Sequence, residues 1–71
     1  MPKLPRISGS EIVRALQRLG FEVVRQRGSH IIMRRGSSGC VVPNHLEVKV
    51  GTLAGVLRQA GVSTEEFIAA L

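Results

Sequence analysis

Residues 21–43, FEVVRQRGSHIIMRRGSSGCVVP, decide the fold of this 71-residue chain. Three short segments within them, residues 21–26, 30–34 and 39–43, are rich in the β-branched and aromatic residues that favour strands. The connections, residues 25–29 and 35–39, are rich in Gly, Ser and Arg and short enough for hairpins. The stretch therefore predicts a three-stranded antiparallel sheet, in which Pro43 ends the third strand or places it at an edge.

A helix is predicted before the sheet. Ser8 can cap it, and Glu11 three residues later can return the hydrogen bond, so we expect the helix to begin at Gly9. Gly20 supplies a left-handed stop. Apolar residues at helical spacing give this helix one buried face: Ile12, Ala15, Leu16 and Leu19.

A second helix is predicted after the sheet, ending at Gly61. Gly55 inside it should cost about 1 kcal/mol relative to alanine, which we interpret as a sign of close packing against the sheet. Ser63 and Glu66 form another capping box and open a short last helix through Leu71. The apolar face of the second helix has i, i+3, i+4, i+7 spacing: Leu53, Val56, Leu57 and Ala60.

The predicted order is therefore α-β-β-β-α with a short C-terminal helix, an α+β fold in one domain spanning residues 1–71. An antiparallel sheet of this size cannot bury both faces, so we expect both main helices on one face and the other face open. Double-stranded RNA-binding domains share this order of elements. The open face is where function is expected.

Composition favours a polyanionic partner. A net charge of +5 and a sequence pI near 11.2 favour nucleic acid ahead of an anionic membrane surface. Only 3% of residues are aromatic, which argues against readers of single strands that stack bases on Phe or Tyr. Binding through RNA shape and backbone is compatible with this composition.

Several site types and locations are not expected. Cys40 is the only cysteine, so a disulfide within the chain is impossible, and one cysteine with two separated histidines makes a zinc site implausible. We expect Cys40 to be a small buried hydrophobe. No metal or cofactor is predicted. We expect no signal peptide, because the segment MPKLPR at 1–6 is too short and too proline-broken for one. No apolar run approaches the ~20 residues that span a membrane, so a cytoplasmic protein is expected.

His30 is the leading candidate for chemistry. Alternation puts Ile31 and Met33 in the core and His30, Ile32 and Arg34 on the open face. A neutral imidazole can accept the proton of an RNA 2′-hydroxyl, which becomes a nucleophile beside the scissile phosphate. The alternative, a solvated histidine that merely begins a strand after a Gly-Ser turn, stays open.

Basic and polar residues around His30 complete the predicted site. The four arginines of the central stretch, Arg25, Arg27, Arg34 and Arg35, indicate binding of a polyanion, although a solvated basic face is the alternative. His45, in the loop after Pro43, is a weaker candidate, as a general acid for the leaving 5′ oxygen. The residues predicted to bind substrate or stabilise charge on the phosphoryl oxygens are Arg25, Arg27, Ser29, Arg34 and Lys49.

The pattern as a whole resembles the HicA family of bacterial toxins over nearly the whole chain. The motifs that carry the resemblance are LGF at 19–21, GSH at 28–30, PNH at 43–45, GTL at 51–53 and QAG at 59–61. The resemblance implies a double-stranded RNA-binding-like fold, metal-independent cleavage of messenger RNA, and a HicB antitoxin that blocks the site. It also implies that His30, the histidine of the Gly-Ser-His motif, is catalytic.

Two positions depart from the family pattern. Members of the family often carry Pro before the Gly-Thr-Leu motif and a basic residue after it, whereas this chain has Val50 and Ala54. These residues leave the start of the second helix with less positive charge for holding RNA.

Two other functions are compatible with the sequence. One is a non-catalytic RNA-binding module that uses the same basic face. The other is an interaction protein whose open sheet face binds another chain.

Overall fold

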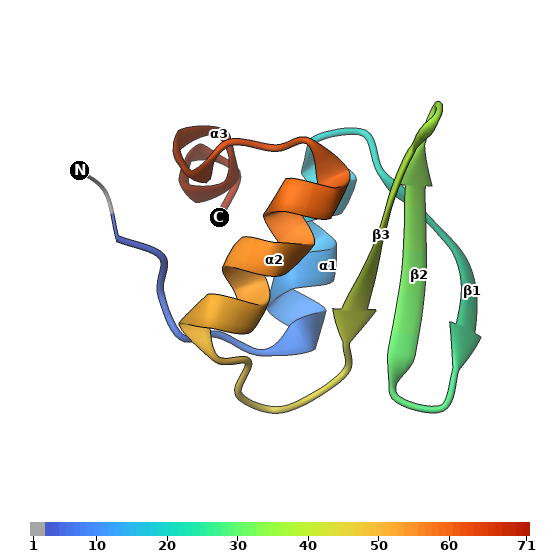
Figure 1. Cartoon of the computed structure of the whole chain (residues 1–71), viewed down its shortest axis with the longest axis horizontal. Coiled ribbons are helices and arrows are strands. Elements are labelled where there is room, and N and C mark those ends of the chain that lie inside the picture. Colours follow the sequence, from blue (N-terminus) through green and yellow to red (C-terminus); the bar gives the residue numbers. More distant parts are fainter. Residues whose placement is uncertain (1–2) are drawn as a thin grey trace.

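The computed structural model describes residues 3–71, which form three helices and one sheet (Figure 1). The predicted α-β-β-β-α order with a short third helix is confirmed. The element bounds are α1 Gly9–Arg18, β1 Glu22–Arg27, β2 His30–Arg35, β3 Ser38–Pro43, α2 Val50–Ala60 and α3 Thr64–Ala69.

Helix α1 begins where the capping box predicts. The Ser8 hydroxyl accepts the Glu11 backbone N–H at 3.1 Å, and the Glu11 carboxylate accepts the Ser8 backbone N–H at 3.0 Å. The Glu11 carboxylate also accepts a hydrogen bond from the Ser8 hydroxyl at 3.0 Å. The bond from the Ser8 backbone, followed by the bond from its side chain, lowers the pKa of Glu11. The helix ends before Gly20, whose φ of 96° is rarely adopted by other residues. The box of Ser63 and Glu66 is also present at the start of α3.

Both hairpin connections are shorter than predicted. They consist only of residues 28–29 and 36–37, so the prediction that residues 25–29 and 35–39 are connections is wrong. Gly28 and Gly36 have φ values of 57° and 59°, and the serine after each has a negative φ. This is the type II′ pattern, in which the turn twist matches that of the strands. Arg25 and Arg27 therefore belong to β1.

The sheet has the order β1-β2-β3, with antiparallel pairing throughout. Figure 1 shows α1 and α2 on the same side of it, and both helices pack against β3. Ile31 and Met33 of β2, with Cys40 and Val42 of β3, are buried against the helices. The prediction of one covered and one open face is confirmed.

The core is aliphatic with two aromatic residues. Phe21 and Phe67 are both buried, so neither ring is available for stacking on a ligand. Burial of Cys40 raises the pKa of its thiol, as expected for a small buried hydrophobe. The remaining buried hydrophobic residues are Ile12, Ala15, Leu16, Ile31, Met33, Val42, Val48, Leu53, Val56, Leu57, Ala60 and Val62.

Helix α2 differs from the prediction at Gly55. A Cβ at this position would meet no atom of the sheet within 4 Å, and its nearest neighbour would be Arg58 Nη2 at 3.7 Å. The expected close packing of Gly55 is therefore wrong. The close approach lies instead at Gly9, where a Cβ would contact the Pro43 carbonyl oxygen and lie 2.9 Å from Asn44 Cα.

Candidate functional site

Four of the predicted site residues lie together on the open face. Arg27 pairs with His30 across β1 and β2, and Arg25 pairs with Ile32 in the next row. Cross-strand partners point to the same face, and side chains two residues apart do so as well, so Arg34 shares this face. The prediction that His30, Ile32 and Arg34 share the open face is confirmed by the burial of Ile31 and Met33.

A β-bulge brings the two arginines of β1 to the His30 face. Val23 pairs with Met33 on the helix side of the sheet, and the register then shifts so that Arg25 pairs with Ile32. Val24 is the extra residue. Without it, simple alternation from Val23 would turn Arg25 and Arg27 toward the helix side. The insertion thus gives the open face two of its three arginines.

His30 is exposed, and backbone hydrogen bonds of neighbouring segments fix its position. It begins β2 directly after the turn and pairs with Pro43 of β3. The Asn44 N–H donates to the Ser29 carbonyl at 2.6 Å, and the Gly9 N–H donates to the His45 carbonyl at 2.8 Å. The turn, the loop after β3 and the start of α1 are therefore connected. This connection fixes the strand end from which His30 projects.

Positive charge dominates the open face. Arg25, Arg27 and Arg34 are exposed, and none forms an ion pair with any residue in the range 3–71. Glu22 is the one acidic residue of the three strands. It is the cross-strand neighbour of Arg34, at the end of the sheet far from His30, but forms no ion pair with it. Unpaired arginines leave their N–H donors available to an anion such as a phosphate.

Arg35, the fourth arginine of the central stretch, has a structural role. Its Nη1 donates to the Leu19 carbonyl at 2.8 Å, and its guanidinium carbon lies 4.6 Å from the centroid of the Phe21 ring. It pairs with Ser38 rather than with a residue of the open face. Arg35 therefore connects β2 to the segment between α1 and β1.

Three other predicted site residues lie around the end of the sheet near His30. Ser29 is exposed in the turn itself. His45 and Lys49 follow β3 and line a hollow of about 290 Å³ with Thr52 of α2. The β1–β2 turn and the loop after β3 lie at the same end of the molecule (Figure 1). The structure thus groups His45 with Lys49, separately from the arginines.

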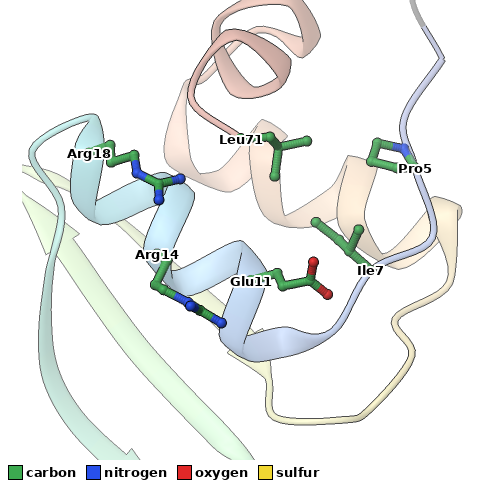
Figure 2. Close-up of a pocket in the computed structure, with 6 residues that line it drawn as sticks. All are labelled: Pro5, Ile7, Glu11, Arg14, Arg18 and Leu71. Atoms are coloured by element: carbon green, nitrogen blue, oxygen red, sulfur yellow. The ribbon is translucent and has the colours of Figure 1, made fainter.

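A second hollow, of about 330 Å³, lies over α1 on the helix side of the sheet. Figure 2 shows Arg14, Arg18 and Glu11 of α1 at one side of it, opposite Pro5, Ile7 and Leu71. Arg18 Nη1 donates to the Ala70 carbonyl at 2.8 Å, so this arginine connects α1 to the C-terminal segment. None of the predicted site residues lines this hollow.

The described residues give no structural basis for a metal site or a membrane span. Across residues 3–71, no three His, Cys, Asp or Glu side chains gather as ligands of a metal ion do. In the same part of the chain, no helix combines the length and the apolar character needed to cross a bilayer.

Two residues outside the predicted set also shape the open face. Gly39 pairs with Arg34 and leaves that position of β3 without a side chain. Gln59 of α2 reaches the edge of β3, where its side-chain oxygen accepts the Val41 N–H at 3.3 Å. In the sequence, residue 39 lies where a predicted connection and a predicted strand overlap, and Gln59 lies in the Gln-Ala-Gly motif at the end of the second predicted helix. Neither position carries a local signal of its role in the site.

The fold and this face together define a class. The chain is a small basic protein with the α-β-β-β-α order that double-stranded RNA-binding domains share. Its open face has an exposed histidine among arginines that form no ion pair within residues 3–71. Comparison with protein families then gives a match to the HicA toxin of bacterial toxin–antitoxin systems over residues 9–62. This range contains the sheet, α1 and α2, and the chain belongs to the HicA toxin family. A comparison with curated proteins finds no match.

Proposed function

We propose that this toxin is a metal-independent ribonuclease that cleaves messenger RNA in the cytoplasm, with His30 as the general base. In this proposal residues 1–71 act as one RNA-binding and ribonuclease domain. The observation that carries it is the exposed His30 beside Arg27, on the face that also presents Arg25 and Arg34. Membership of the HicA toxin family supports a toxic activity.

The proposed reaction needs only RNA and the side chains of this face. His30 takes the proton of a 2′-hydroxyl, and that oxygen attacks the adjacent phosphorus. The bond between phosphorus and the 5′ oxygen of the next nucleotide breaks, and the leaving oxygen takes a proton from water or from a general acid. The products are a 2′,3′-cyclic phosphate and a 5′-hydroxyl. DNA lacks the nucleophile and is not a substrate.

Basic side chains stabilise the charge that develops on the phosphoryl oxygens. Arg27 is the nearest candidate because it is the cross-strand partner of His30. Arg25 and Arg34 bind the neighbouring nucleotides, and Ser29 donates a hydrogen bond from the turn. Lys49 and His45 lie beyond the end of β3, at the end of the sheet near His30. Lys49 contacts the RNA there, and His45 is the candidate general acid for the leaving 5′ oxygen.

The proposed partner is a HicB-type antitoxin that blocks the open face. Family membership implies an antitoxin as the kind of partner. A face that carries three unpaired arginines favours a partner with acidic side chains. Such a partner would compete with RNA for the same charges.

Cleavage assays test the proposal. Purified protein, His30→Ala and His45→Ala are each incubated in EDTA with a long single-stranded RNA and with DNA of the same sequence. We expect the parent to cut RNA and leave DNA intact, and His30→Ala to bind RNA but lose cleavage by at least about 100-fold. His30 is exposed, so its replacement should change stability by less than about 0.5 kcal/mol. Equal RNA binding without cleavage by any of the proteins would favour the alternative, a non-catalytic RNA-binding module.

A further inference from the structure

The open face contains a hollow where β3 lacks a side chain. Gly39 pairs with Arg34, and the space above Gly39 forms part of a hollow of about 370 Å³. Arg34 and Val41 border this hollow, and Gln59 lines it at the edge of β3. The hollow is shallow and open to solvent, so it has room for one flat group lying on the sheet.

The hollow is bordered by apolar surface and one flat cation. Ile32 and Val41 are cross-strand partners, and Val41 is 39% exposed. They form an aliphatic surface in the middle of a charged face. Arg34 adds a planar guanidinium, a group on which bases stack in RNA-binding proteins. A flat, partly apolar ring attached to a phosphate matches this combination.

Gln59 lines the hollow with hydrogen-bond donors. Its Oε1 accepts the Val41 N–H at 3.3 Å, and its Nε2 has no hydrogen bond within residues 3–71. The free group is therefore a pair of N–H donors. Donors favour the exocyclic carbonyl oxygens O6 of guanine and O4 of uracil over the exocyclic amines that occupy the same positions, N6 of adenine and N4 of cytosine.

We propose that this hollow binds one base of the RNA strand and that Gln59 discriminates between bases there. The inference rests on the proposed ribonuclease function and adds a base preference to it. Ile32 and Arg34 lie two and four residues after His30 on β2, which corresponds to about 7 and 13 Å along the strand. The recognised base therefore belongs to a nucleotide close to the phosphate that reacts at His30.

Four variants and a control test the hollow. Gly39→Val fills it, Val41→Ser makes its surface polar, and Gln59→Met removes the donors while Gln59→Glu replaces them with acceptors. Val23→Ser is the matched control because Val23 is 43% exposed, close to the 39% of Val41, but points to the helix side of the sheet. Circular dichroism at the assay temperature checks that every variant is folded.

The measurement is cleavage in EDTA of an RNA with randomised sequence, followed by sequencing of the product ends. The parent should prefer G or U over A or C by about 3- to 10-fold at one position near the cut. Gln59→Glu should reverse this ratio, and its added charge should lower all rates alike without changing the ratio. Gly39→Val, Val41→Ser and Gln59→Met should bring the ratio close to one, and Val23→Ser should keep it.

The outcomes separate the inference from the proposed function. A parent that cuts RNA with no base preference, or a preference that survives in all four variants, refutes the hollow and leaves the ribonuclease standing. A Val23→Ser protein that loses the preference as Val41→Ser does would also refute it. A parent that neither binds nor cuts RNA refutes both.

Discussion

Replacing Gly9 by alanine should destabilise the protein at the point where α1 meets the loop after β3. The added Cβ would lie 2.9 Å from Asn44 Cα and 3.1 Å from the Pro43 carbonyl carbon. These neighbours are backbone atoms that cannot rotate away. The start of α1 and residues 43–45 must therefore separate.

The magnitude follows from three contributions. Overpacking of this kind costs about 1–3 kcal/mol. Separation also lengthens the 2.8 Å hydrogen bond from Gly9 N–H to the His45 carbonyl, which contributes about 1 kcal/mol. The higher helix propensity of alanine offsets at most about 1 kcal/mol. The free energy of unfolding should fall by about 2 kcal/mol, and for a domain of this size Tm should fall by about 8–16 °C.

Gly55→Ala is the matched control, because this glycine lies inside α2 with no sheet atom near its missing Cβ. It should stabilise the protein by about 0.5–1 kcal/mol through helix propensity alone. Thermal and urea unfolding, followed by far-ultraviolet circular dichroism, measure both variants. If Gly9→Ala raised Tm as Gly55→Ala does, the close contact between Gly9 and residues 43–45 would be wrong.

Four further predictions concern the helix caps, the acid dependence of stability, the thiol and the open face. Ser8→Ala and Ser63→Ala should each lower the free energy of unfolding by about 1 kcal/mol in urea titrations. The double variant should lose the sum of the two, and a loss smaller than that sum would argue against two independent caps. The folded-state pKa values of Glu11 and Glu66 are below the ordinary value of 4.5, so each carboxylate stabilises the fold fully above pH 4.5, and this stabilisation is lost as pH falls through the lower folded-state pKa. Glu11→Gln should therefore flatten the fall in the free energy of unfolding at acid pH. An unchanged slope of that free energy against pH would contradict this prediction. Because burial raises the pKa of the Cys40 thiol, iodoacetamide should alkylate it much more slowly in the native protein than in urea, and equal rates would show that Cys40 is accessible. Arg27→Ala should reduce the slope of log K for RNA against log salt by about 0.7, whereas Arg14→Ala, on the helix side, should leave it unchanged; equal slopes in both variants would place the RNA elsewhere.

Local rules predict the parts of the fold that depend on neighbouring residues. Both capping boxes are visible in the sequence because each needs only a serine and a glutamate three residues later. The face of His30 follows from alternation in β2, where Ile31 and Met33 are buried and their neighbours are not. In both cases the period of the element and the environment agree.

Long-range contacts explain the errors. All six residues of β1 are exposed, so its polar half, from Arg25 to Arg27, has no buried side to distinguish it from a loop. The bulge at Val24 changes which face these arginines use, and it depends on the register with β2. Gly9 and Gly55 are both glycines of predicted helices, and nothing in the sequence distinguishes their packing. Only Gly9 lies against backbone atoms of residues far away in the sequence, Pro43 and Asn44. Gly39 and Gln59 meet only after α2 packs on the edge of β3.

The most direct test of the central claim is the identity of the nucleophile. An RNA that the protein cuts at one position is compared with the same RNA carrying a single 2′-deoxy nucleotide on the 5′ side of that cut, in EDTA and with His30→Ala in parallel. If His30 activates the 2′-hydroxyl, the unmodified RNA ends in a 2′,3′-cyclic phosphate, and both the 2′-deoxy substitution and His30→Ala abolish the cut. Cleavage of the 2′-deoxy RNA at the same position and at the parent rate would contradict the account.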